Sequence, residues 1–178
     1  MDSLNFLSPE KVVQIFDLQT GDHVADFGTG HGFFAIQLAK AVGAKGKVYA
    51  IDVQKSALDV VRSYAAKEHL ANIEPLLADL EHPRGLPIKS DFIDFVLVSN
   101  VLFQAENKIG LIKEAYKILR SGGKIAVIEW DNSNTSLGPP PGMRIDKERL
   151  KDVCVKINFK FLREFPAGQQ HYGMIFRK

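Results

Sequence analysis

The sequence predicts an α/β domain whose doubly wound, mostly parallel sheet of seven strands ends in an antiparallel hairpin. Short apolar runs alternate with helical patterns along most of the chain. The last two extended runs are joined by a short connection that contains residues 166–168 and is too short for a crossover helix. At 178 residues with 46% hydrophobic content, the chain is expected to form one domain, residues 1–178.

The first half of the chain is expected to contain two helices between three strands, after a leading helix within residues 1–20. Ser8 would cap that leading helix, and Pro9 suits its first helical position. The strands are expected at residues 23–28, 47–52 and 73–79, and the helices at 32–42 and 54–70. The first strand is apolar almost throughout, which is typical of a strand covered on both faces.

The second half is expected to complete the sheet and to carry a long loop. A β-rich run at residues 92–100 precedes a helical stripe from Ala105 to Leu119, and residues 121–123 would stop that helix. A strand at 124–130 leads into residues 131–145, the predicted substrate-side loop, which contains three consecutive prolines. A helix is expected near 150–157, with Cys154 on the face that packs into the core. Strands are expected after it, at 159–165 and 171–176.

The composition gives no indication of a nucleic-acid partner, a membrane span or a metal site. A net charge of +2 from 23 basic and 21 acidic residues requires neither nucleic acid nor membrane as a partner. The excess of basic residues in 144–178 is explained by a solvated helix face and a basic last strand. No apolar run approaches the ~20 residues of a membrane span, and no His and Cys spacing predicts a metal site. The single cysteine and the absence of a signal peptide favour a cytoplasmic setting.

The chemistry is expected to centre on a glycine-rich turn at residues 24–34. Gly28, Gly30 and Gly32 stand at alternate positions between an apolar strand and an apolar helix. Glycine allows positive φ and lets backbone amides approach a ligand closely, and the helix start adds unpaired N–H groups. The turn therefore predicts a ligand site, although several unrelated nucleotide-binding families use such a turn.

Carboxylates at the ends of the next two strands narrow the choice of ligand. Asp52 follows Gly28 by 24 positions, where a Rossmann-type site places a carboxylate that accepts the ribose hydroxyls of adenosine. Asp79, and Ser99 with Asn100, follow later strands and should line the same crevice. Helix capping is the alternative role for Asp52 and for Asp79.

The turn itself argues against a dinucleotide. Position 33 is Phe33, where a dinucleotide fingerprint requires glycine. Asp26 precedes the turn, and no Lys or Arg stands in it. A negative side chain favours a ligand with an ammonium and a sulfonium over a pyrophosphate, unless Asp26 only accepts backbone amides.

Taken together, these motifs resemble those of the class I S-adenosylmethionine-dependent methyltransferases, which have a Rossmann-like fold. The stretches 24–32, 49–53, 76–80, 94–100 and 121–129 are similar to that family's motifs in the family's order and spacing. The run Arg-Ser-Gly-Gly-Lys-Ile-Ala-Val-Ile-Glu-Trp, followed by Gly-Pro-Pro-Pro-Gly-Met-Arg-Ile, is similar to the small-molecule branch that includes quinone-ring C-methyltransferases.

The resemblance implies that S-adenosyl-L-methionine is the cofactor. Gly28 and Gly30 would run under its methionine part, beside Asp26, and Asp52 would accept the ribose hydroxyls. Val53 would pack on the adenine, and Asp79 would accept the adenine amino hydrogens. The cofactor-binding set that the resemblance implies is Asp26, Gly28, Thr29, Gly30, Phe33, Asp52, Val53, Ala78, Asp79, Leu80, Ser99 and Asn100.

The expected reaction is methyl transfer to an unidentified small-molecule acceptor. Such a displacement depends mainly on aligning donor and acceptor in a dry site, so a general base is optional and no catalytic residue is assigned. Glu129 and Asp131 are the candidate bases, and Phe103 and Trp130 would form apolar walls around the acceptor.

Other residues and functions are expected to matter less. His31 is expected to line the turn, and His171 and Tyr172 to be surface or packing residues. Asn100-Val101-Leu102-Phe103 departs from the Asn-Pro-Pro-Tyr pattern of family members that methylate amino groups, and arsenic methylation would require more cysteines. The alternatives left open are an RNA or protein methyltransferase and a non-catalytic adenosylmethionine- or NAD-binding module. A homodimer could close the open site.

Overall fold

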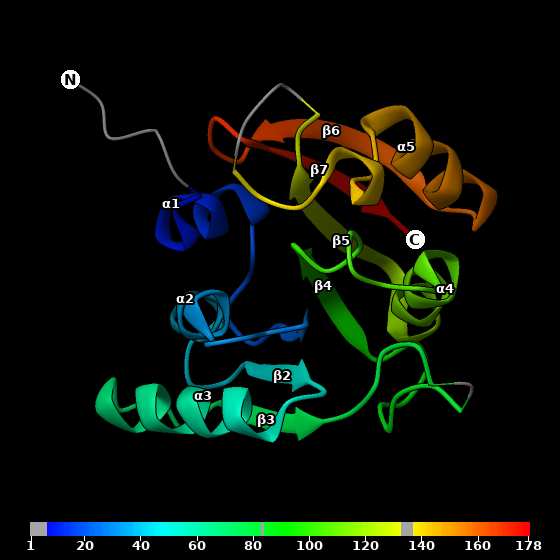
Figure 1. Cartoon of the computed structure of the whole chain (residues 1–178). Helices are drawn as coiled ribbons and strands as arrows, with labels where there is room; N and C mark the ends of the chain where they lie inside the picture. Colours follow the sequence, from blue (N-terminus) through cyan, green and yellow to red (C-terminus); the bar gives the residue numbers. More distant parts are fainter. Residues whose placement is uncertain (1–6, 83, 133–136) are drawn as a thin grey trace.

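Strand β1 (His23–Phe27) lies in the middle of a seven-stranded sheet in the order β3-β2-β1-β4-β5-β7-β6 (Figure 1). The computed structural model describes residues 7–82, 84–132 and 137–178. The other strands are β2 (Lys47–Asp52), β3 (Ile73–Leu77), β4 (Ile93–Ser99), β5 (Leu119–Trp130), β6 (Lys160–Pro166) and β7 (His171–Arg177). The helices are α1 (Pro9–Val13), α2 (Phe33–Val42), α3 (Lys55–Lys67), α4 (Lys108–Ile118) and α5 (Lys147–Lys156), with 3₁₀ turns at Gln14–Phe16 and Pro141–Met143.

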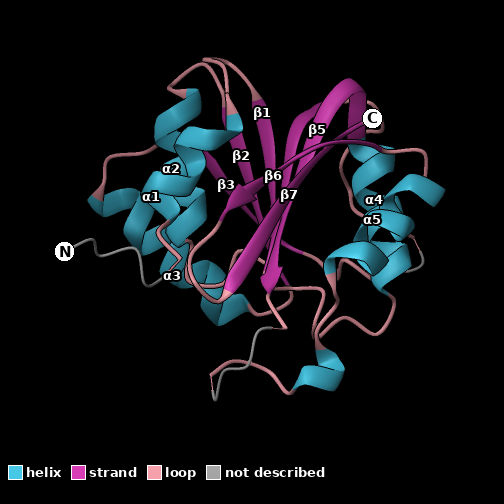
Figure 2. Ribbon diagram, turned by 90° about the horizontal axis from the view of Figure 1, so that it is seen from above, coloured by secondary structure: helices cyan, strands magenta, loops and turns pink. Residues whose placement is uncertain are grey.

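The sheet is covered by helices on both faces. Figure 2 shows α1, α2 and α3 on one side of the strands and α4 and α5 on the other. Two hydrophobic cores follow from this arrangement, one between the sheet and α1 to α3 and one between the sheet and α4 and α5. Side chains of successive strand residues alternate between these cores, so almost every residue of β1 and β4 is buried.

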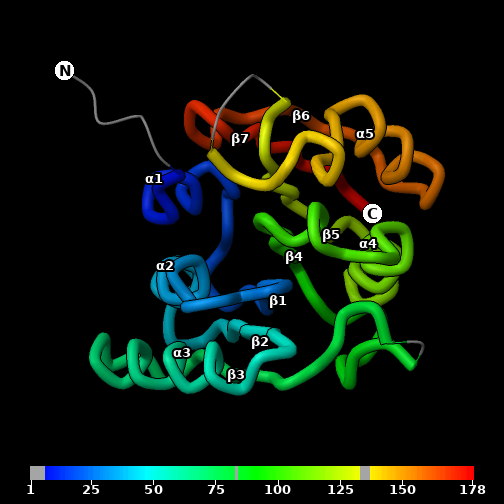
Figure 3. Tube along the Cα trace, viewed as in Figure 1, coloured from blue at the N-terminus to red at the C-terminus, as the bar shows by residue number. Residues whose placement is uncertain are grey.

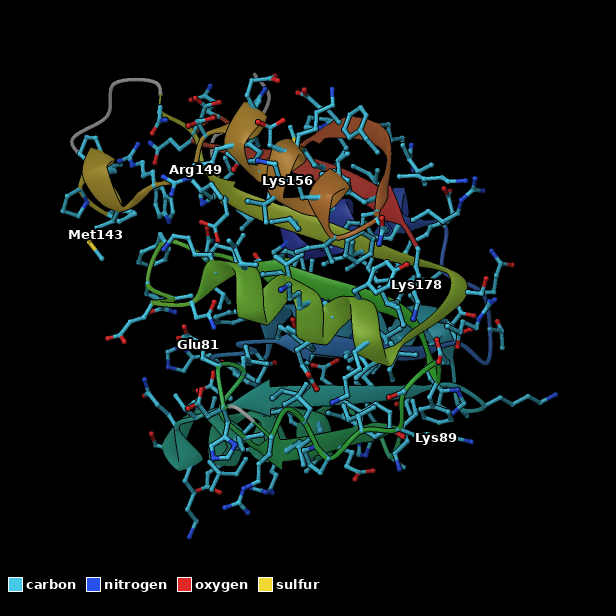
Figure 4. All side chains as sticks on the ribbon, turned by 90° about the vertical axis from the view of Figure 1, so that its right-hand side faces the viewer. Glu81, Lys89, Met143, Arg149, Lys156 and Lys178 are labelled. Carbon is cyan, nitrogen blue, oxygen red and sulfur yellow. The ribbon has the colours of Figure 1, made fainter. Side chains whose placement is uncertain are left out.

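The strand order brings the carboxyl ends of five parallel strands to one edge. β3, β2, β1, β4 and β5 pair in parallel, and β7 pairs antiparallel with both β5 and β6. The chain reverses its winding direction between β1 and β4, and ligands bind at such a switch point in open α/β sheets. The trace in Figure 3 shows the loops that follow β1, β2, β4 and β5 meeting along this edge. Figure 4 shows Glu81 and Met143 on the edge, opposite Lys89 and Lys178.

The predicted fold is confirmed, and several boundaries differ from the prediction, three of which bear on the site or the sheet. The leading helix changes into a 3₁₀ turn and ends at Asp17, which has a φ of 55°. β3 ends at Leu77, so Asp79 lies in the following loop. Residues 119–123 were expected to end a helix but belong to an irregular start of β5, because Leu119 is extended, buried and paired with Ile93 before a register shift.

Candidate functional site

Three neighbouring cavities lie along the carboxyl edge of the sheet. The β2-side cavity, of about 510 Å³, is lined in part by Gly28, Gly30, Asp52, Val53, Asp79, Leu80, Ser99 and Asn100. The central cavity, of about 440 Å³, is lined by Leu7, Pro9, Asp26, Gly28, Thr29, Phe33, Phe34, Ser99 and Asn100. The β7-side cavity, of about 380 Å³, is lined by Leu7, Asn100, Trp130, Leu137, Gly138, Gln170 and His171.

Shared walls join these cavities into one row. Gly28, Ser99 and Asn100 belong to both the β2-side and the central cavity, and Leu7 and Asn100 belong to both the central and the β7-side cavity. An elongated ligand could therefore occupy the first two cavities and present one of its groups to the third. Asn100 borders all three.

The backbone of the glycine turn forms the floor of the row. Gly28 has a φ of 69°, and a Cβ at this position would lie 2.5 Å from Cγ2 of Val101. Gly32 has a φ of 81°, and a Cβ there would lie 2.8 Å from Cγ2 of Val61. Any larger residue would thus be strained and would collide with a neighbour, so both positions require glycine. The close approach lets the turn after β1 pack directly on the loop after β4.

Asp26 brings a buried carboxyl group to the central cavity. Its side chain is 2% exposed, and its Oδ2 accepts a hydrogen bond of 2.7 Å from Oγ1 of Thr29. Burial, helped by the nearby charge of Asp52, raises the pKa of Asp26 to about 7 despite the opposing hydrogen bond from Thr29. A cation in the central cavity would stabilise the ionised carboxylate and would offset the free-energy cost of burying its charge.

Asp52 at the end of β2 organises the β2-side cavity. Its Oδ2 accepts a hydrogen bond of 2.9 Å from the amide of Gly30, and its Oδ1 accepts one of 2.9 Å from the amide of Gln54. The carboxylate thereby fixes the glycine turn and also receives an amide at the start of α3, close to the capping role expected as an alternative. Each oxygen retains a second acceptor position, so hydroxyl groups of a ligand could still bind to it.

The other residues expected around the adenosine follow the ends of β2 and β3. Asp79 is exposed, and its Oδ1 accepts a hydrogen bond of 2.9 Å from the amide of Glu81. Val53 is 60% exposed at one wall of the cavity, whereas Leu80 is buried at another. Ala78 donates its amide to the carbonyl of Asp52 and so ties the loop to β2. Val53 and Leu80 give the cavity apolar walls, and Asp79 adds a carboxylate, whereas Ala78 does not line the cavity.

Asn100 stands at the centre of the row in an unusual conformation. Its φ is 56°, and its amide donates to the carbonyl of Ile128. Its side-chain Oδ1 is buried and has no hydrogen-bond partner among the described residues. A buried acceptor without a partner costs free energy, so this oxygen is available to a donor on a ligand. Ser99 precedes it at the end of β4 and lines the first two cavities.

The structure separates three of the four residues expected around an acceptor, Glu129, Phe103 and Trp130. Glu129 is 0% exposed, and its Oε1 accepts hydrogen bonds from the amides of Val101 and Leu102 at 2.9 and 2.6 Å. Burial raises the pKa of Glu129 to about 7. Phe103 borders a different cavity, together with Met143 and Arg144. Of these residues, only Trp130 lines the row. Glu129 supports the β4 loop from the interior and does not form part of the cavity surface.

Removing the Glu129 carboxyl group should loosen the β4 loop. Glu129→Ala is expected to lower the free energy of unfolding by about 1–3 kcal/mol, because two buried amides lose their acceptor. Glu129→Gln keeps an acceptor oxygen and should cost less. Urea titrations of both variants, with the exposed Glu106→Ala as the control, would measure this difference. Equal stabilities of the Ala and Gln variants would contradict the proposed support of the loop.

Two residues on the β7 side escaped the sequence predictions. His171 was expected to be a surface or packing residue, and its ring does pack against that of Trp130 at a centroid distance of 4.3 Å, but it also lines the β7-side cavity. Arg144 is buried and donates to the carbonyls of Asp131, Leu137 and Pro139. An arginine directly after a loop rich in proline and glycine was the available signal for such a carbonyl-binding role.

Within the described ranges, no group of three or more His, Cys, Asp or Glu side chains could hold a metal ion. No helix in the part of the chain that the structure covers is long and apolar enough to cross a membrane. Cys154 is buried in the core, as expected. The row is lined by carboxylates, amides, one imidazole and aromatic side chains.

The chain is similar to known methyltransferases in sequence. The family model described as a methyltransferase domain matches residues 18–177. Aklanonic acid methyltransferase from Streptomyces is 31% identical over 125 residues, which cover 69% of this chain and 56% of that protein. The ubiquinone/menaquinone biosynthesis C-methyltransferase of Pseudomonas fluorescens is 29% identical over 126 residues, 70% of this chain and 48% of that protein. The chain thus spans about half the length of these curated relatives.

A solved structure supports the same relationship. A SAM dependent methyltransferase from Aquifex aeolicus is 28% identical and superposes with a TM-score of 0.88, covering 98% of this chain and 91% of that one.

A further relative matches over a smaller part of its own length. An arsenite methyltransferase from Halobacterium salinarum is 30% identical over 107 residues, which represent 60% of this chain but only 27% of that protein.

Proposed function

Because the chain belongs to the methyltransferase domain family, we propose that it transfers a methyl group from S-adenosylmethionine to a small-molecule acceptor. The observation that carries this proposal is the row of joined cavities that runs from Asp52 past Asp26 to Asn100. It offers acidic and amide acceptors along its length, together with a backbone floor made by the glycine turn. Such a site suits an adenosine at one end and a cationic amino-acid group beside it.

The residues present fit S-adenosylmethionine. The carboxylate of Asp52 would accept the ribose hydroxyls, and Asp79 would accept the amino hydrogens of the adenine. Val53 and Leu80 would provide the apolar walls around the adenine. This assignment agrees with the free acceptor positions on Asp52 and with the absence of any Lys or Arg in the glycine turn.

The central cavity fits the methionine part of the same molecule. Oδ1 of Asn100 lacks a partner among the residues that the structure describes and would accept a hydrogen bond from the ammonium. Asp26 would supply a negative charge close by, Gly28 and Gly30 the backbone floor, and Thr29 and Phe33 parts of the wall. When bound, the cofactor would supply an electrophilic methyl group on sulfur. The protein's own task is to hold the two substrates in line and to exclude water.

Calorimetry tests this function directly. S-adenosylmethionine and its demethylated product, S-adenosylhomocysteine, are expected to bind with micromolar affinity, on the order of −8 kcal/mol, and NAD is expected not to bind. Binding of NAD alone would reject the cofactor assignment, because it would require room for a pyrophosphate on the glycine turn. Adenosine serves as the control ligand, since it should fill only the β2-side cavity.

A small acceptor is favoured over a macromolecule or arsenite. Two of the curated relatives are named for quinone and aklanonic acid substrates, and the balanced charge of the chain gives no general attraction to nucleic acid. An RNA acceptor would be indicated by binding that declines steeply with salt. The single cysteine is buried, which argues against arsenite chemistry and is compatible with a cytoplasmic protein. A second subunit could close the row, and sedimentation would reveal it.

A further inference from the structure

Three buried polar atoms without partners belong to residues at the carboxyl edge of the sheet. In the described residues they are Oδ1 of Asn100, Oε2 of Glu129 and Nε2 of His171. β4, β5 and β7 are neighbours, and the pairs Ser99 with Ile128 and Trp130 with His171 bring these residues together. Buried polar groups in native proteins normally have partners. Glu129 supports the β4 loop and does not line a cavity of the row, and Oδ1 of Asn100 is proposed to accept from the ammonium of the cofactor. Nε2 of His171 is therefore the atom that points to a further ligand.

His171 and Asn100 are the two members of this group that line the β7-side cavity. The apolar walls of the same cavity come from Leu7, Trp130 and Leu137. Leu7 and Asn100 also line the central cavity, where the methionine part of the cofactor is proposed to bind. A molecule in the β7-side cavity would therefore lie next to the donor end of the row.

The imidazole of His171 is suited to accept a hydrogen bond. Burial and the positive charge of Arg144 lower the pKa of His171, so the ring is neutral at pH 7 and one of its nitrogens is an acceptor. Its ring lies against that of Trp130 at 4.3 Å, which fixes its position. The guanidinium of Arg144 lies 5.8 Å from the centre of the Trp130 ring, and its charge disfavours a cationic ligand nearby.

We propose that the β7-side cavity is the acceptor subsite, an inference that rests on the proposed function. In this subsite the imidazole of His171 accepts a hydrogen bond from a hydroxyl group of a small, uncharged acceptor. An amine that carries a positive charge would be disfavoured by Arg144. A molecule without a donor would leave the imidazole unpartnered. His171 thus acts in this subsite as a specificity-determining residue.

Trp130 is the sole tryptophan of the chain, so its fluorescence reports on the subsite without requiring turnover. The protein, saturated with S-adenosylhomocysteine, is titrated with phenol and with anisole, which has the same ring but no hydroxyl hydrogen. Phenol is expected to bind about 3- to 10-fold more tightly than anisole to the wild-type protein. His171→Phe keeps an aromatic ring beside Trp130 and should bind both probes equally.

A second measurement separates recognition from structural damage. The signal of the acceptor nitrogen of the His171 imidazole in NMR spectra, assigned by its loss in His171→Phe, should show the shift caused by an accepted hydrogen bond in saturating phenol and should not show it in saturating anisole. His69→Asn changes an exposed histidine that lines a distant cavity with Asn72 and is expected to preserve the preference for phenol. It serves as the matched control.

Two outcomes would overturn the inference. Either the wild-type protein binds phenol and anisole equally, or His171→Phe retains the preference for phenol. If S-adenosylhomocysteine still binds in calorimetry in either case, the proposed function stands and only the acceptor subsite is wrong. If S-adenosylhomocysteine fails to bind, the proposed function fails instead.

Discussion

Asp26→Asn is expected to weaken the binding of S-adenosylmethionine by about 10- to 100-fold, because a charge-assisted contact with the ammonium is lost. The unliganded variant should at the same time be more stable than the wild type above about pH 8. The pKa of Asp26 is raised from 3.8 to about 7 by folding, so the folded protein binds more protons than the unfolded chain between these values. The contribution of Asp26 to the free energy of unfolding therefore declines as the pH rises from about 4 to about 7. Asparagine does not titrate, so the variant lacks this decline.

Calorimetry and urea unfolding at several pH values measure both effects. In the wild-type protein the affinity should fall by up to about tenfold per pH unit below about pH 7, since a cation binds to the ionised carboxylate and must displace its proton. Buffers of different ionisation enthalpy should reveal that proton release. The matched control is Asp59→Asn, which alters a carboxylate on α3 that pairs with Arg62. An affinity independent of pH in the wild type would place the ammonium away from Asp26.

Asp52→Ala is expected to weaken the binding of S-adenosylmethionine by about 1–3 kcal/mol. Two contributions are combined in this loss. The ribose hydroxyls lose a charged acceptor, and the amides of Gly30 and Gln54 lose the oxygens that now hold them. The β2-side cavity would therefore be both less complementary to the ligand and less rigid.

Adenosine and 2′-deoxyadenosine separate these two contributions. If Asp52 accepts the 2′-hydroxyl, the wild-type protein should prefer adenosine, and Asp52→Ala should bind the two nucleosides nearly equally. Asp52→Asn retains one acceptor oxygen and should lose less affinity. A preference for adenosine that survives in Asp52→Ala would assign the ribose contact to another residue and would leave Asp52 with a structural role only.

The residues that form the floor of the row could be located from the sequence because their positions follow from backbone chemistry. The φ of Gly28 and the space taken by Val101 demand glycine, and a carboxylate at the end of β2 reaches the neighbouring turn across one parallel pairing. These requirements are local, or they connect adjacent strands in a regular register. The alternate glycines after the first predicted strand, and the spacing from Gly28 to Asp52, were sufficient to predict these positions.

The acceptor side could not be located in the same way, because it depends on which face of the sheet each side chain occupies. Glu129 and Trp130 are adjacent in sequence, yet one supports the β4 loop from the interior and the other lines a cavity. His171 is set opposite Trp130 by the antiparallel register of β7 on β5, which joins segments far apart in the sequence. Neighbouring residues on a strand point to opposite faces, and a sequence pattern of mostly apolar residues does not reveal which face is which.

The three carbonyl contacts of Arg144 have a consequence for the kinetics of the acceptor cavity. One guanidinium ties residues 137, 139 and 144 together and links them to Asp131, so the conformational entropy of residues 137–144 is lost when the protein folds and not when a molecule binds. The described part of the wall is thus preorganised. Association should then be limited by encounter and by the release of water from the cavity, and residence time should depend on the contacts made inside it.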